Sequence, residues 1–200
     1  MLTILSNDPG ASIKVAGYGY AVVQVRRKDK RLACRILENG VVPMDATITQ
    51  LKDSKLYLVQ REAYLKFMGS KMKAFPGIQA IVAERYMSRG RMGATGEYVN
   101  HMLGALGTTY PNLPVKWMSA ASWKNAVRRS DVDLDYTYKI VRTTKHQLDA
   151  CLQGIWAACF AFKEKDFGSF QLKKLLPGLL DQIEATSTAP LHNRKIKRKK

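Results

Sequence analysis

Short apolar runs alternate with polar turns over the first forty residues of the chain. Residues 2–7, 16–25 and 32–38 are rich in Leu, Ile, Val and Tyr, and the turn sequences RKDKR and ENG follow the second and third runs. Apolar runs of this length, rich in β-branched and aromatic residues and bounded by turn formers, are typical of strands. The pattern predicts a three-stranded antiparallel meander.

The spacing of apolar residues changes to that of a helix between residues 56 and 75. Leu58, Leu65, Met68 and Met72 recur at helical intervals, and a Pro-Gly pair follows at residues 76–77. Apolar residues at this period mark the buried face of a helix, and Pro-Gly stops it. We therefore predict a helix whose buried face carries these four side chains.

Strands and helices alternate in the next part of the chain. The segment IQAIVAE, residues 78–84, is almost entirely apolar, as strands buried on both faces of a parallel sheet are. A helix from about residue 94 to 107, a short strand in LPVKWM and a helix in SAASWKNAVRR, with Ser119 as a candidate cap, continue the alternation. This order favours parallel pairing. We expect an α/β fold whose five-stranded mixed sheet joins the antiparallel meander to parallel strands and is flanked by helices.

The last third of the chain changes in composition. After the acidic turn SDVDLD, a pair of helices is expected, of which TKHQLDACLQGIWAACFAF, residues 144–162, is the more apolar. Residues 185–193 are small and polar, and residues 194–200 hold six Lys or Arg. We assign residues 1–184 to one domain, with a helical extension from about residue 163, and residues 185–200 to a flexible basic tail.

The charge of the chain indicates a polyanionic partner. Thirty-three Lys and Arg against sixteen Asp and Glu give a formal net charge of +17 over 200 residues. Removing the six basic residues of the tail leaves +11 on the body. A charge of this size on a small surface repels itself unless a polyanion neutralises it, which favours nucleic acid as the partner.

The cysteines and the apolar runs exclude other classes of protein. Cys34, Cys151 and Cys159 form no C-x-x-C pair and leave one residue over, which indicates neither a zinc knuckle nor a disulfide framework. The apolar stretch GIWAACFAF is too short to span a bilayer. We therefore expect a cytoplasmic protein, in a bacterium or a phage-infected host, without a membrane partner.

Three acids and a histidine occupy positions that a fold alone does not require. Asp8 follows the first strand, Glu84 ends a parallel strand, and Asp149 lies on the last apolar helix three residues after His146, on the same helical face. Groups at the ends of adjacent strands converge at one edge of an open sheet, and a helix that crosses the edge adds ligands. We expect the four side chains to meet there.

Three carboxylates and an imidazole suit a hard divalent metal ion with open positions for substrate. Two such ions, roughly 3.5–4 Å apart, would support phosphodiester hydrolysis. Gly10 and Gly17 would let a DNA backbone approach closely. Each residue also has a structural interpretation. Asp-Pro-Gly is a common turn, and Glu84 can end a surface strand. His146 and Asp149 can lie on a solvated helix face. Glu97, His101 and the acids of residues 131–135 are assigned to the surface.

Four motifs together resemble one family. The segments NDPGASIKVAGYGYAVV, QAIVAERYM, PVKWMSAASWKNAV and HQLDAC, in this order and spacing, are similar to the RuvC-type Holliday junction resolvases of the ribonuclease H-like superfamily. That family has a first strand ending in Asp-Pro-Gly, a Gly-aromatic-Gly second strand, a Glu at the end of the fourth strand, a Lys in the helix after the fifth and a final helix with Asp/His-x-x-Asp-Ala. The likeness covers residues 2 to about 162.

The resemblance implies a set of roles. The metal-binding catalytic residues would be Asp8, Glu84, His146 and Asp149. Lys124 would lie near the scissile phosphate. Two Mg²⁺ ions per active site, replaceable by Mn²⁺, would support hydrolysis. A homodimer would cut symmetric strands of a four-way junction, since its two-fold symmetry matches that of the substrate.

The chain departs from the family in three places, one of which is a third strand and turn that are more charged than usual. The segment between Lys124 and His146 is shorter and more acidic than the family's basic loop, so Lys139 and Lys145 are only candidates for a second active-site lysine. Residues 163–200 extend beyond the usual end. A chain this compact and divergent is consistent with a phage origin.

The segment after Glu84 is a candidate DNA-binding loop. RYMSRGRMGATGEY combines aromatic, Met, Arg and Gly residues. Tyr86 and Met87 could wedge into the opened centre of a junction, as apolar and aromatic side chains do between bases. The remaining candidates for phosphate contacts are Arg85, Arg89, Arg91, Lys14 and Lys124. An ordinary surface loop is the structural alternative. The basic segments QVRRKDKR and KKLLPGLL are expected to contact duplex arms.

Two alternatives to a resolvase stay open. Flap, branch and terminase-type nucleases of the ribonuclease H-like superfamily share the same carboxylates. A nonenzymatic basic protein that binds nucleic acid would carry these acids incidentally, and replacement of Asp8 by Asn would then cost it nothing.

Overall fold

The computed structural model describes residues 1–9, 18–28, 31–42, 54–85, 94–129 and 144–158. Five strands form one mixed sheet in the order β3-β2-β1-β4-β5. The first three strands form an antiparallel meander: β1 (Leu2–Pro9), β2 (Tyr18–Lys28) and β3 (Arg31–Val41). The other two run parallel to β1: β4 (Ala80–Arg85) and β5 (Val115–Ser119). The predicted mixed sheet of an antiparallel meander and parallel strands is confirmed.

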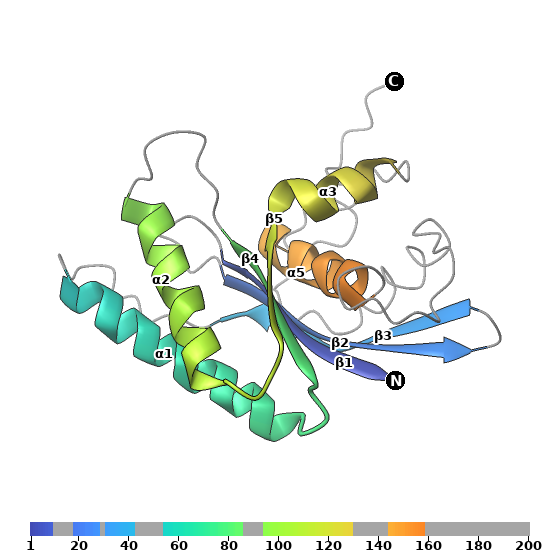
Figure 1. Ribbon diagram of the computed structural model, residues 1–200, viewed down its shortest axis with the longest axis horizontal. Coiled ribbons are helices and arrows are strands. Elements are labelled where there is room, and N and C mark those ends of the chain that lie inside the picture. The colour runs from blue at the N-terminus through green and yellow to red at the C-terminus, as the bar shows by residue number, and fades with distance from the viewer. Residues whose placement is uncertain (10–17, 29–30, 43–53, 86–93, 130–143, 159–200) are drawn as a thin grey trace, which may run out of the picture.

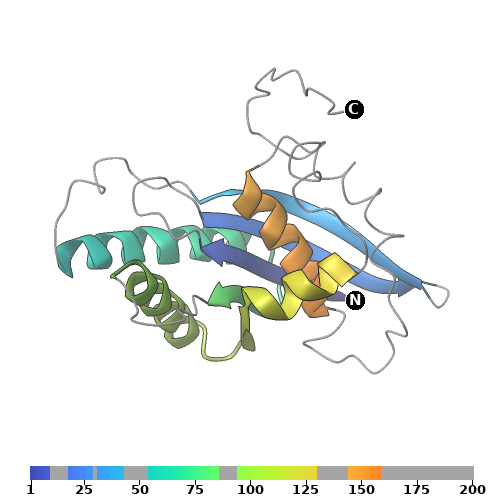
Figure 2. The same ribbon diagram turned by 90° about the horizontal axis from the view of Figure 1, so that it is seen from above.

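Helices cover both faces of the sheet (Figures 1 and 2). Helices α1 (Ser54–Ala74) and α2 (Ala94–Thr109) lie on one face, and α3 (Ala120–Arg129) and α5 (Lys145–Trp156) lie on the other. Alternate residues of β1 explain the two layers, because Leu5 packs with the first pair of helices and Ile4 packs with α5. None of the described helices is both long and apolar enough to cross a membrane.

The predicted buried face of α1 is largely confirmed, with one exception. Met68 is buried, and Leu65 and Met72 pack against the same core, whereas Leu58 is 45% exposed. Among the described side chains of α1, the fully buried ones also include Gln60 and Tyr64, so the buried face is rotated slightly from the predicted one. Tyr64 packs against Tyr18 of β2, with ring centroids 5.9 Å apart.

Polar contacts join α1 to the sheet and stabilise the start of α5. Lys71 of α1 pairs with Glu38 of β3, which also accepts a hydrogen bond from Tyr20. Helix α5 begins with a capping box: the Thr144 hydroxyl accepts from the Gln147 amide at 3.2 Å, and the Gln147 side chain accepts from the Thr144 amide at 3.0 Å. Caps of this kind satisfy backbone donors that a helix leaves free at its start.

Several predicted segments lie outside the described residues. They are the Gly10 to Gly17 turn, most of the candidate DNA-binding loop, the acidic turn and its following helix, the extension from about residue 163 and the basic tail 185–200.

The strands β2 and β3 continue as a hairpin past the start of β1, since β1 begins opposite Val25 while residues 26–28 pair only with β3. The described residues of the basic segment QVRRKDKR, 24–28 and 31, therefore lie at the end of the sheet opposite Asp8.

Candidate active site

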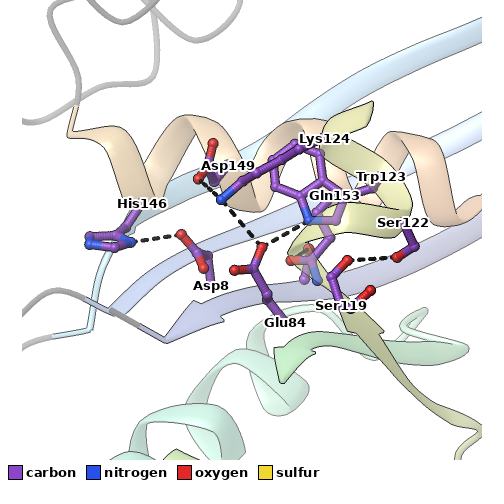
Figure 3. Close-up of polar contacts among 10 residues, drawn as sticks. Asp8, Glu84, Ser119, Ser122, Trp123, Lys124, His146, Asp149 and Gln153 are labelled. Carbon is purple, nitrogen blue, oxygen red and sulfur yellow. Dashed lines mark hydrogen bonds and ion pairs between the residues drawn. The ribbon is translucent and has the colours of Figure 1, made fainter. Parts of the chain in front are cut away.

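Two of the predicted acids come from neighbouring parallel strands. Strands β1 and β4 pair in register from Ile4 and Ala80 to Asn7 and Ala83, and the next residues along each strand are Asp8 and Glu84. Equivalent positions on adjacent parallel strands project to the same face. Both carboxylates therefore point toward the α3 and α5 side of the sheet, as Figure 3 shows.

Helix α5 brings the other two predicted residues to the same place. His146 Nδ1 lies 2.7 Å from Asp8 Oδ2, although 138 residues separate them in the sequence. Asp149, one turn further along α5, is 1% exposed and faces the sheet beside them. The predicted meeting of Asp8, Glu84, His146 and Asp149 at one sheet edge is thus what the structure displays.

Lys124 of α3 lies among the carboxylates. Its Nζ is 2.7 Å from Asp149 Oδ2 and 3.5 Å from Glu84 Oε2. The neighbouring Trp123 is fully buried, and its indole Nε1 donates a 2.9 Å hydrogen bond to Glu84 Oε2. Helix α3 therefore supplies both a cation and a neutral donor to Glu84, near the carboxyl end of β4.

A glycine on β2 allows α5 to approach this closely. Gly19 pairs with Asp8, and a Cβ atom on Gly19 would lie 2.0 Å from the His146 carbonyl oxygen. Real Cβ atoms essentially never approach backbone so closely. The first turn of α5 can thus rest directly on the β2 backbone, which places His146 beside Asp8.

Charges within the site shift the proton affinities of its groups. Burial, and next the negative charge of Asp8, raise the pKa of Glu84 to about 7, against the opposing effects of Lys124 and of the Trp123 hydrogen bond. Burial opposes the charge on Lys124, but its contact with Asp149 and the charge of Glu84 outweigh burial and raise its pKa. The hydrogen bond to Asp8 raises the pKa of His146 above 6.5. Positive charge close to these carboxylates therefore stabilises their ionised forms.

The chemical types of the donors suit a hard divalent cation. Three carboxylates and one imidazole gather at a partly buried edge, and oxygen-rich sets of this kind suit Mg²⁺ and Mn²⁺. In the described part of the chain, no three His, Cys, Asp or Glu side chains are arranged closely enough to hold a metal ion as they stand. Lys124 and His146 instead lie against the acids as counterions. Metal binding by these residues stays a prediction.

The remaining predicted residues are exposed at the ends of elements or lie outside the described part. Arg85 is exposed at the last position of β4, and Lys145 is exposed at the first position of α5. The predicted residues that lie outside the described part are Lys14, Tyr86, Met87, Arg89, Arg91 and Lys139. Their roles in DNA binding stay predictions.

Three further residues shape the site although the sequence motifs gave them no role: Gly19, Trp123 and Gln153. Gln153 is fully buried on α5, and its amide reaches the Asn7 carbonyl oxygen and the Glu84 amide nitrogen. A signal for it was present, since a Gln four residues after Asp149 lies on the same helical face within an otherwise apolar stretch. Trp123 gave a weaker signal, its place immediately before Lys124.

Comparison with solved structures identifies the fold class. The chain is similar to the Thermus thermophilus RuvC structure, with a TM-score of 0.57 and 19% identity over 80% of this chain and 96% of that chain. It is equally similar to T. thermophilus RuvC in complex with Holliday junction substrate, with a TM-score of 0.57 and 18% identity over 82% of this chain and 97% of that one. The sequence matches no protein-family model and no curated protein. The predicted resemblance to RuvC-type resolvases is confirmed at the level of the fold, which is RuvC-like and ribonuclease H-like.

Proposed function

We propose that this protein is a metal-dependent DNA endonuclease that resolves four-way junctions by paired, symmetric nicks. The observation that carries the proposal is the convergence of Asp8, Glu84 and Asp149 from β1, β4 and α5 on one edge of a RuvC-like sheet. Carboxylates from three separate elements, partly buried and close together, cost stability through mutual repulsion and desolvation. A catalytic role accounts for keeping them there.

Divalent cations would be held by Asp8, Glu84 and Asp149, with His146 as a nitrogen ligand or a proton carrier. Mg²⁺ at such a site, with Mn²⁺ as a substitute, would supply an activated water and charge neutralisation for phosphodiester hydrolysis. The chain's own residues have further tasks. Trp123 holds the Glu84 carboxylate by its 2.9 Å hydrogen bond, and Lys124 offers a cation to the scissile phosphate.

Branched DNA is the proposed substrate. The net charge of +17 matches a polyanion, and the RuvC structure that this chain resembles is one that has been solved with Holliday junction substrate. A homodimer would present two such sites to the two-fold symmetric junction. Arg85, exposed directly after Glu84, lies where the chain enters the proposed wedge segment with Tyr86 and Met87.

Cleavage of labelled DNA tests the proposal. Four-way, three-way, flap and plain duplex substrates are compared in Mg²⁺ for the wild type, Asp8→Asn and Glu84→Gln. Paired nicks at the four-way junction by the wild type alone, with junction binding kept by both variants, are the expected result. Glu62→Gln, an exposed acid on α1, is the matched control and should cut like the wild type.

Other outcomes separate the alternatives. Flaps cut as fast as four-way junctions would make the protein a broader branch nuclease with the same site. If neither the wild type nor any variant cuts DNA and all bind it equally, the proposed endonuclease activity is wrong. A basic nucleic-acid-binding protein would then remain.

A further inference from the structure

Gln153 is a fully buried polar residue in helix α5, where it follows the apolar run Leu148 to Leu152, which only Asp149 interrupts. It lies four residues after Asp149 on α5, and its neighbours Leu152, Gly154 and Ile155 are buried as well. A buried amide without partners costs about 1–3 kcal/mol. The partners of Gln153 therefore decide why an amide stands at this position.

These partners are backbone groups of two different strands. One orientation of the amide satisfies both: its nitrogen donates to the Asn7 carbonyl oxygen at 2.9 Å, and its oxygen accepts from the Glu84 amide nitrogen at 2.8 Å. The Ser6 hydroxyl lies 3.4 Å from the same end of the amide as Asn7. Gln153 thus bridges β1 to β4 through both of its polar atoms.

The bridge lies where the two strands stop pairing. The register between β1 and β4 ends with Asn7 opposite Ala83, and the two acids are the next residues. The Gln153 amide joins the carbonyl that precedes Asp8 to the N–H of Glu84 itself. Figure 3 shows its side chain beside Glu84, below the Trp123 ring. The amide therefore fixes the separation of the two backbones at the point from which both carboxylates project.

We propose that Gln153 is a positioning residue that sets the distance between Asp8 and Glu84. Catalytic groups must be held to within about 0.5 Å of the productive geometry. A side chain fixed at two points on two strands, and itself held by a packed helix, provides such a constraint. The same helix carries Asp149 and His146. One rigid element therefore determines the relative positions of all four residues of the cluster. The effect on cleavage rests on the proposed function, whereas the bridge itself does not.

The bridge is tested on the full-length, metal-free protein by NMR. Scalar coupling across a hydrogen bond should connect the Glu84 amide nitrogen to the side-chain carbonyl carbon of Gln153. Gln153→Met, which keeps the length of the side chain but has no amide, should accelerate hydrogen exchange of the Glu84 amide at least tenfold relative to that of Val82 in the same strand. A coupling from Glu84 to the Asn7 carbonyl instead would overturn the inference, even if Gln153→Met fails to fold.

Positioning is tested by kinetics. Gln153→Met should lower kcat for junction cleavage by about 10- to 100-fold, the usual consequence of a displacement near 1 Å, while KM changes less than about twofold. Ile155→Val on the same helix trims a buried side chain without touching either strand's backbone at the acids, and should keep the wild-type kcat. Wild-type kcat in Gln153→Met would overturn the positioning role.

The two proposals fail in different ways. A wild type that cuts no branched DNA overturns the proposed function but leaves the NMR coupling to decide the bridge. A wild type that cuts, combined with an absent coupling, overturns the bridge alone.

Discussion

Gly19 of β2 lies directly beneath His146 of α5, so that a methyl group on Gly19 would approach the His146 carbonyl oxygen to 2.0 Å. The two backbones touch at the residue that pairs with Asp8. This contact sets the height of α5 above the sheet and hence the position of His146 and Asp149. Helix α5 and strand β2 together therefore determine whether the cluster exists.

Gly19→Ala should displace the start of α5 and separate His146 from Asp8. We expect a loss of about 3 kcal/mol or more in the free energy of unfolding, since the overlapped atoms are backbone and cannot rotate away. Junction cleavage should fall with it. Thermal or urea unfolding measures the first effect. Gly104→Ala in α2 is the matched control, because a Cβ there meets nothing within 4 Å, and it should be neutral or stabilising. Equal stability of the two variants would contradict this account of Gly19.

Lys124 and a divalent cation should compete for the same carboxylates. Lys124→Met leaves Asp149 buried without its 2.7 Å cationic partner, which should destabilise the metal-free protein by about 3 kcal/mol. Mg²⁺ or Mn²⁺ should restore more stability to this variant than to the wild type, although cleavage falls. Thermal unfolding with and without the ion measures both shifts. Lys73→Met, at an exposed position of α1, serves as the control. Equal metal-induced shifts in wild type and Lys124→Met would show that the lysine and the metal use different groups.

Trp123→Phe should raise the pKa of Glu84 further. The Phe ring keeps most of the buried volume but removes the indole donor that stabilises the Glu84 carboxylate at 2.9 Å. Loss of a hydrogen bond to a charged group is worth about 1.5–3 kcal/mol, so the titration of Glu84 should move upward from about 7 by roughly a unit. Carbon-detected NMR of the Glu84 carboxyl group follows it directly. An unchanged midpoint would mean that the indole does not stabilise the ionised form.

The stability of the metal-free protein should fall as the pH rises from about 4.5 to about 7. Over this window the folded state retains a proton on Glu84 that the unfolded state has lost, so ionisation costs free energy only in the folded protein. The loss should be on the order of 1–3 kcal/mol. His146 acts in the same direction, because its pairing with Asp8 stabilises the protein below pH 6.5 and is lost as the pH passes its raised pKa.

Urea unfolding at a series of pH values measures this slope. Glu84→Gln should flatten it between pH 4.5 and 7, whereas Glu62→Gln on the exposed side of α1 should not. Divalent cations should reduce the loss in the wild type by supplying the missing positive charge. A wild-type profile that rises through this window would contradict the assigned burial of Glu84.

The order of the elements and the placement of acids at the ends of strands were predictable from local sequence. Strand periodicity and turn residues predicted the meander, and the apolar run before Glu84 predicted a parallel strand with an acid at its carboxyl end. These are local properties, readable from spacing, and topology rules bring the ends of adjacent parallel strands together. Helical spacing likewise placed His146 and Asp149 on one face of α5.

The contacts that hold these residues depend on how distant elements pack and could not be predicted from local spacing. The contacts between Asp8 and His146, between Glu84 and Trp123, and the Gln153 bridge join elements far apart in the chain. The same is true of the face of α1, where periodicity gave a helix but packing left Leu58 exposed. Periodicity records which residues share a side of one element, whereas the partner of that side depends on the depth and rotation at which two elements pack. In this protein the absence of a side chain at Gly19 allows α5 to lie at the depth where His146 meets Asp8 and Asp149 meets Lys124.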